Sequence, residues 1–136
     1  MFKLLKITDS GASAPEIISI NATNSMECRA NHVYTVKGGT LHAPLHNDGF
    51  LFVPIEDLPM ESEIEKIRGY LVSPNMLFET SFVGPATNTY AGDNVSASVD
   101  DSGIATGITN EPGTFATIID MSTQKQNGRV IIRINA

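Results

Sequence analysis

The sequence lacks several features that mark familiar classes of small protein. It has one cysteine, Cys28, so an internal disulfide is impossible. That absence favours a reducing compartment over a disulfide-stabilised secreted module. The apolar run in the opening MFKLLKITDSG is shorter than the roughly 7–15 residues of a signal-peptide core, and no run approaches the roughly 18 of a membrane span. We therefore expect a protein folded inside a cell, with no membrane partner.

Basic residues are scarce in the middle of the chain. Between Gly38 and Gln124 there are twelve acidic residues and two basic ones, Lys66 and Arg68. The other basic residues lie towards the two ends, at Lys3, Lys6, Arg29, Lys37, Lys125, Arg129 and Arg133. Nucleic-acid binding draws most of its affinity from cations at phosphates, so nucleic acid is not an expected partner. If the two ends form one basic edge, that edge could dock onto an acidic protein surface.

Short runs with a period of two indicate β-strands. Asp93–Asp120 holds three such runs, separated by turn residues at Asp101–Gly103 and Asn110–Gly113. Further strands are expected at Glu16–Thr23, His32–Lys37, Thr40–Leu45, Phe50–Ile55, Met76–Gly84 and Arg129–Ile134. No strand–helix–strand repeat appears. The sequence predicts an all-β, mainly antiparallel fold, a small β-barrel or sandwich of about eight to ten strands with at most one short helix near residues 60–70.

Turn residues suggest how neighbouring strands pair. Gly38-Gly39 indicates a tight hairpin, and Thr40–Leu45 is expected to pair with Phe50–Ile55 across an Asp-Gly turn. Leu41–Phe50 and Val95–Ile104 share a pattern of aliphatic residues, a polar turn and glycine. The two stretches are either hairpins built on one template or a true duplication.

The N-terminal residues allow two interpretations. Phe2–Ile7 alternates only loosely and is either a first strand or a docking arm, and Thr8–Pro15 has the composition of a linker. The domain prediction is a possible N-terminal arm at residues 1–15 and a single β domain at residues 16–136.

Glu56–Val72 is the stretch that best fits a helix. Apolar residues recur on one helical face, and Ser62 with Glu65 fits a capping box. The face consists of Met60, Ile64, Ile67 and Leu71. A competing interpretation makes Lys66–Ser73 a strand, and Gly69 weakens the helix.

The only cysteine and all three histidines lie close together in sequence, at Cys28, His32, His42 and His46. This grouping superficially resembles a zinc ligand set. Residues four apart on a strand are separated by about 13 Å, so each pair would need a turn to converge. We expect no metal and no cofactor.

The sequence also gives little support for a catalytic site. A thiolate at Cys28 with His42 or His46 as base and Asp48 as orienting group has the required residue types but no local signature. Asp100-Asp101 is better explained as a turn than as an acid–base pair. Lys37–Thr40 lacks the first glycine and the following helix of a phosphate loop. The chain is not expected to be an enzyme.

The C-terminal half carries a family resemblance. Its segments NMLFETSF, NTYAGDNVSASVDDSGIAT, GTFATIID and NGRVIIRINA resemble the small head decoration (cement) proteins of tailed bacteriophages. The matching residues are Gly92–Val95, Gly103, Gly113 and Arg129–Ile134. The resemblance covers about sixty residues of the chain.

The resemblance implies a structural function. Such proteins bind the exterior of an assembled capsid, commonly as trimers, and hold neighbouring major capsid subunits together. A member would be made in the bacterial host cytoplasm and end on the virion. The capsid-contact candidates are the residues of the two basic ends, Phe2, Lys3, Leu4, Leu5, Lys6, Arg129 and Arg133.

Two other classes stay open. One is a non-catalytic ligand- or carbohydrate-binding β module, although the chain has no tryptophan and three tyrosines, Tyr34, Tyr70 and Tyr90. The other is a neck, tail or baseplate component of the same kind of virion.

Overall fold

Eleven β-strands make up the regular structure of the described residues. A computed structural model describes residues 1–8, 14–22, 27–42, 49–59, 66–84, 88–121 and 128–135. The strands are β1 (Lys3–Ile7), β2 (Ile18–Asn21), β3 (Tyr34–Lys37), β4 (Thr40–His42), β5 (Phe50–Pro54), β6 (Lys66–Leu71), β7 (Met76–Ser81), β8 (Asn94–Val99), β9 (Ala105–Pro112), β10 (Ala116–Asp120) and β11 (Arg129–Ile134). The all-β prediction is confirmed. No helix long and apolar enough to cross a membrane occurs in these ranges.

Five strands close into a small barrel in the order β2-β4-β3-β5-β6. β3 and β4 form the hairpin expected at Gly38-Gly39, whose φ angles of 60° and 77° are ones that glycine adopts without strain. A single parallel pairing, Asn21 with Thr40, closes the ring between β2 and β4. The interior is filled by large buried side chains, chiefly Tyr34, Leu41, Phe52 and Ile67.

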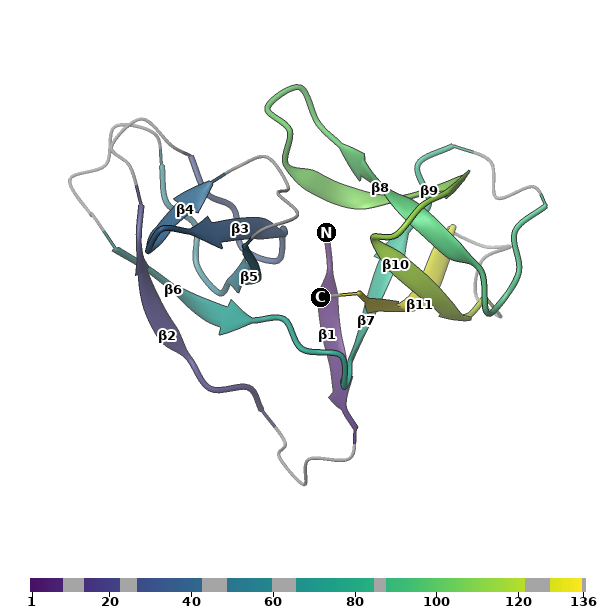
Figure 1. Cartoon of the computed structure of the whole chain (residues 1–136), viewed down its shortest axis with the longest axis horizontal. Helices are drawn as coiled ribbons and strands as arrows, with labels where there is room; N and C mark the ends of the chain where they lie inside the picture. Colours follow the sequence, from purple (N-terminus) through teal and green to yellow (C-terminus); the bar gives the residue numbers. More distant parts are fainter. Residues whose placement is uncertain are drawn as a thin grey trace.

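The other six strands form a sheet in the order β1-β7-β11-β10-β8-β9. Figure 1 shows the barrel on the left, β7 to β11 on the right and β1 between them. All the pairings in the sheet are antiparallel. β7 lies between β1 and β11, so this sheet joins the first strand of the chain to the last.

Both outer strands of the sheet are modified where a flat edge would otherwise face solvent. The pairing of β1 with β7 has a bulge between Leu4 and Lys6, and two of the five residues of β1 are lysines. The β9 edge turns back onto the end of β7, where the Val83 N–H donates to the Ile108 carbonyl at 2.9 Å. Bulges, lysines and covered edges all hinder the addition of a foreign strand.

Phe2 joins the barrel to the sheet. Its side chain is fully buried and meets the Phe115 ring edge to face, with ring centroids 5.8 Å apart. Its N–H donates to the Asn31 carbonyl of the barrel at 2.6 Å. The surrounding hydrophobic cluster contains residues of both parts, among them Val53 and Tyr70 from the barrel and the β7 and β11 side chains from the sheet. The two parts therefore share one core.

The backbone of Met1 extends this junction into the sheet. The Thr80 hydroxyl donates to the Met1 carbonyl at 2.9 Å, and the Met1 nitrogen donates to the Thr106 carbonyl. Of the two interpretations of Phe2–Ile7, the structure agrees with the first strand rather than the docking arm, because Lys3–Ile7 pairs with β7 on both sides of the bulge at Leu5.

The helix expected within Glu56–Val72 is wrong where the chain is described. Lys66–Leu71 is β6, paired with both β2 and β5, as the competing interpretation of Lys66–Ser73 proposed. Gly69 explains the choice, because a Cβ there would lie 2.3 Å from the Val53 carbonyl oxygen. The close β5–β6 contact needs glycine and overrides helical spacing. Ser62, Glu65 and the rest of 60–65 lie outside the described residues.

One predicted pairing also differs from the structure. Thr40–His42, the described part of Thr40–Leu45, does not pair with Phe50–Ile55, because β4 and β5 lie on opposite sides of β3. The two ends of Leu41–Phe50 therefore belong to strands that are not paired with each other, whereas Val95–Ile104 spans the turn of the β8–β9 hairpin. Residues 43–48 lie outside the described residues. The three strands of Asp93–Asp120 do not lie side by side in chain order, since β8 lies between β9 and β10. The prediction paired strands that follow each other in the sequence, whereas in the structure their neighbours include strands from other parts of the chain.

Replacing Phe2 tests the junction. Phe2→Ala is expected to lower the free energy of unfolding by about 3–5 kcal/mol, the usual cost of deleting a buried phenylalanine ring. The measurement is urea unfolding followed by circular dichroism. Leu5→Ala, three residues further along but 42% exposed, is the control and should change stability by less than about 1 kcal/mol. Equal effects of the two substitutions would contradict the assignment of Phe2 as the joining side chain.

Replacing Tyr70, unlike replacing Phe2, is not expected to lower stability. Its ring is 4% exposed in the shared core, and its hydroxyl has no hydrogen-bond partner among the described residues. Burial raises the pKa of this phenol to about 12. Tyr70→Phe removes an unsatisfied buried group, so we expect stability to stay equal or rise by about 1 kcal/mol in thermal unfolding. Tyr90→Phe, at an exposed position, should leave the midpoint unchanged. A clear loss of stability in Tyr70→Phe would show that the hydroxyl is bonded.

Candidate functional site

One cavity brings together several of the residues that the sequence singled out. It lies where the loop before β3 meets the loop after β5, at the end of the barrel nearest the first residue of the chain, and its volume is about 330 Å³. It is lined by Met1, Glu27, Cys28, Arg29, Ala30, His32, Asp57, Leu58 and Pro59. The two loops are held together by a pair of backbone hydrogen bonds of 2.8 Å between Cys28 and Leu58.

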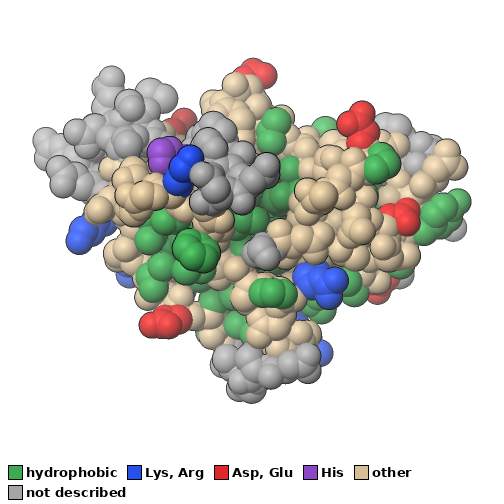
Figure 2. All heavy atoms as spheres, in the orientation of Figure 1, with side chains coloured by type: hydrophobic (Ala, Val, Ile, Leu, Met, Phe, Trp, Pro, Cys, Tyr) green, Lys and Arg blue, Asp and Glu red, His purple; other side chains and the backbone are tan. Residues whose placement is uncertain are grey.

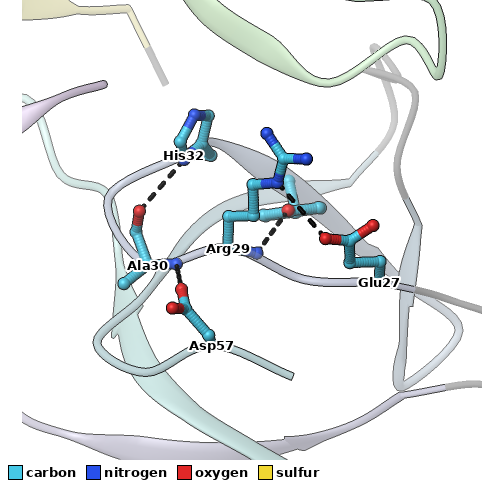
Figure 3. Close-up of polar contacts among 6 residues, drawn as sticks. Glu27, Arg29, Ala30, His32 and Asp57 are labelled. Carbon is cyan, nitrogen blue, oxygen red and sulfur yellow. Dashed lines mark hydrogen bonds and ion pairs between the residues drawn. The ribbon is translucent and has the colours of Figure 1, made fainter. Parts of the chain in front are cut away.

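The charged side chains of the cavity are engaged in holding the loop (Figure 3). The Arg29 guanidinium contacts the Glu27 carboxylate at 3.4 Å, and the Asp57 carboxylate accepts the Ala30 N–H at 2.8 Å. The Arg29 N–H donates to the buried Tyr34 hydroxyl at 2.8 Å. The contacts of Asp57 and of the Tyr34 hydroxyl each fix a backbone N–H, whereas the Arg29–Glu27 contact joins two exposed side chains.

Cys28 is poorly suited to act as a nucleophile. The side chain is 1% exposed, and burial, reinforced by the nearby Glu27 charge, raises the pKa of the thiol to about 11. A nucleophilic thiol needs the opposite shift, because the thiolate is the reactive form. At neutral pH this thiol is protonated and shielded.

Of the histidines that the structure describes, His32 lines the same cavity as the Cys28 thiol and His42 does not. His32 Nδ1 lies 3.0 Å from the Ala30 carbonyl, and a carbonyl accepts, so this nitrogen carries the proton. Burial lowers the pKa of His32 and keeps the ring neutral. His42 lies on β4, with Nε2 3.3 Å from the Lys37 carbonyl. His46 and Asp48 lie outside the described residues.

Metal binding finds no support in the described ranges. They contain no group of three or more histidine, cysteine, aspartate or glutamate side chains that could hold a metal ion.

Two other motifs are turns. Lys37–Thr40 is the β3–β4 turn rather than a phosphate loop. Asp100 is a turn residue as expected, because its carboxylate accepts the N–H groups of Ser102 and Ile104.

The seven capsid-contact candidates separate into buried and exposed residues. Phe2 is fully buried in the shared core, and Leu4, opposite the buried Phe78, packs against that core, so both face inward. The exposed ones are Lys3, Leu5, Lys6, Arg129 and Arg133. The prediction was wrong for these two residues because the sequence does not show which side chains of this segment face the core.

Four exposed cations lie on one face of the sheet, which we call the outer face. Lys3 is opposite Glu79, and Glu79 is in turn opposite Ile131. Lys6 is opposite Leu77, one row further along β7. Arg133, on β11, is opposite Thr117 of β10. The Arg129 guanidinium contacts the Glu79 carboxylate at 3.4 Å across β7 and β11.

Sequence reasoning missed three residues of the outer face: Leu77, Glu79 and Ile131. The signal was available in the alternation of MLFETS, where Met76, Phe78 and Thr80 are buried and the residues between them are half-buried. Register across three strands is needed to bring these residues beside the basic ends, and the sequence does not supply it.

Among the described residues, the face of the molecule drawn in Figure 2 has no concentration of charge of one sign. On the face shown, hydrophobic side chains lie in several separate patches within polar surface, and charged side chains are scattered singly. The most exposed large hydrophobic side chains, Phe50 at 69% and Tyr90 at 68%, come from different parts of the molecule. Scattered apolar groups of this kind are ordinary on soluble proteins.

Comparison with known proteins gives no relative. No family model matches the chain, and neither the curated proteins nor the solved structures contain a significant match.

The state of the Cys28 thiol can be measured directly. In the folded protein at pH 8 it should react with a thiol-specific chromogenic disulfide at least about a hundredfold more slowly than in urea, because it is both protonated and buried. The control is a Ser98→Cys variant in a Cys28→Ser background, because Ser98 is a partly exposed position on β8. Equal rates at the two positions would show that the Cys28 thiol is accessible, and a faster rate at Cys28 would show an activated thiol and reopen the catalytic interpretation.

Proposed function

We propose that this chain is a structural virion protein that binds the exterior of an assembled tailed-phage capsid and stabilises contacts between major capsid subunits. The proposal rests on the sequence resemblance in the C-terminal half and on one structural observation. That observation is the convergence of Lys3, Lys6, Arg129 and Arg133, from opposite ends of the chain, on one solvent-facing sheet surface. A protein that works by binding needs such a surface rather than a reactive centre.

The elements that carry the resemblance are consistent with a rigid binding scaffold. Gly92 and Asp93 form the turn into β8, where the Gly92 N–H donates to the Ile118 carbonyl at 2.7 Å. Gly103 lies in the β8–β9 turn, and Arg129–Ile134 is an interior strand of the sheet. These segments supply turns and strands, and their chemistry is structural.

The mode of contact has to differ from strand donation. Residues 3–7 already pair with β7, so the N-terminal segment does not serve as an extended strand for a capsid subunit. Binding through a sheet face is the alternative that the arrangement allows. A homotrimer is part of the proposal, since three copies around a local three-fold axis would engage several subunits at once.

The carbohydrate-binding alternative has less support. Such modules stack sugars on exposed aromatic rings, and two of the three tyrosines, Tyr34 and Tyr70, are buried in the cores. The exposed rings of Tyr90 and Phe50 come from different parts of the molecule, Tyr90 from the loop before β8 and Phe50 from β5 of the barrel. A neck or tail component would use the same kind of surface, and the experiment below separates it from a capsid component.

The test is co-sedimentation with emptied, expanded heads of the phage that encodes the chain. We expect saturable binding, with the free protein behaving as a trimer by size-exclusion chromatography with light scattering. Native virions that already carry their own complement are the control and should bind little added protein. Failure to bind emptied heads, with binding to isolated tails instead, would replace the capsid proposal by the tail one. Failure to bind either would reject a virion function.

A further inference from the structure

The outer face has a charge opposite to that of the chain as a whole. The full sequence carries fifteen acidic and nine basic residues. On the outer face the cations are Lys3, Lys6, Arg129 and Arg133, and the carboxylates are Glu79 and Asp120, the latter opposite Ile131. A locally positive surface on an acidic protein attracts acidic partners while the remaining surface repels them, and this combination orients an encounter.

The cations surround an apolar centre. Leu77 and Ile131 are half-buried on adjacent strands, and Leu5, in the β1 bulge, is 42% exposed. Neighbouring strands lie about 4.8 Å apart, so β1 and β11, on either side of β7, place their side chains about 10 Å from each other. An apolar centre with a charged rim is the usual anatomy of a protein–protein interface.

One end of the outer face is hollowed. A depression of about 200 Å³ is lined by Met1, Lys3, Glu79, Thr80, Ser81 and Arg129. Two of these side chains are cations and one is a carboxylate, which Arg129 already contacts at 3.4 Å. The hollow has the size for one side chain, and the excess positive charge favours a carboxylate.

Other occupants fit this surface less well. Two copies placed outer face to outer face would bring like charges together, at a cost of several kcal/mol in a close interface. A nucleic acid would meet the four cations but also the chain's net charge of −6. An acidic protein surface satisfies both the cations and the apolar centre.

We propose that the outer face of β1, β7 and β11 is the docking surface of this protein, and that its partner is an acidic patch of a protein, from which an aspartate or glutamate side chain enters the hollow beside Lys3 and Arg129. This inference rests on the proposed function for the identity of the partner, the major capsid protein. The chemistry of the surface is independent of that identity.

The first experiment compares two matched double variants in head binding. Lys6→Glu with Arg133→Glu reverses two exposed charges of the outer face, and Lys37→Glu with Lys66→Glu makes the same charge change on the barrel. Arg129 is left intact because it contacts Glu79. The outer-face variant should weaken binding at least about tenfold, while the barrel variant stays within about threefold of the native protein. Circular dichroism and thermal unfolding establish that both variants fold.

The outcomes separate the two proposals. Equal binding by both variants and the native protein would overturn the docking surface and leave the proposed function standing. Absence of native binding to heads would remove the proposed function, and the surface is then judged by a second probe.

The second probe is poly-L-glutamate, titrated into isotopically labelled protein and followed by amide chemical shifts. We expect shifts confined to β1, β7 and β11, lost in about 1 M NaCl, where the Debye length is about 3 Å. Shifts spread over the barrel strands, or none at low salt, would overturn the proposal. A short DNA duplex that shifted the same signals more strongly would identify a nucleic-acid surface instead and overturn it as well.

Discussion

Burial of the Phe2 ring between a closed barrel and an open sheet is the interaction on which the rest of this structure depends. The Phe2 ring packs on Phe115, and the Phe2 backbone N–H donates to the Asn31 carbonyl. The Met1 carbonyl, just before Phe2, accepts a hydrogen bond from the Thr80 hydroxyl. These contacts tie one residue to the barrel and to two regions of the sheet. A fixed Phe2 places β1 against β7, and this placement decides what the terminal residues present to solvent.

The position of β1 changes the character of the basic ends. A free N-terminal segment would offer backbone groups to a partner, whereas a paired strand offers one row of side chains. β7 lies between β1 and β11, so residues more than a hundred positions apart in sequence contribute to the same surface. The single buried thiol and the neutral histidine lie instead in a loop whose charged groups are occupied in holding its shape.

Local features of the fold could be predicted from sequence, and non-local ones could not. Alternation and turn residues located most of the strands, and Gly38-Gly39 and Asp100–Gly103 were placed in the correct turns. Lys66–Leu71 was misassigned as helix because an apolar spacing was counted without the close backbone contact at Gly69. β4 and β5 were paired with each other because they are neighbours in sequence, although β3 lies between them.

The candidate surface could be predicted only in part, because it too combines local and non-local features. The basic ends identified Lys3, Lys6, Arg129 and Arg133, since charge is read directly from the sequence. Leu77, Glu79 and Ile131 could be added only once the register of three strands was known. Phe2 and Leu4 were included wrongly, because a loosely alternating segment does not reveal which of its residues face inward.

The interior position of β11 has a consequence for biosynthesis. β11 lies between β7 and β10, so neither β1-β7 nor β8-β9-β10 can join into the complete sheet until the ribosome has released residues up to Ile134. The barrel, built from residues 18–71, has no such requirement and could order earlier. Sheets assembled from distant segments form slowly. During that interval the apolar sides of β7 and β10 stand uncovered, and chaperone binding would be directed to these strands rather than to the barrel.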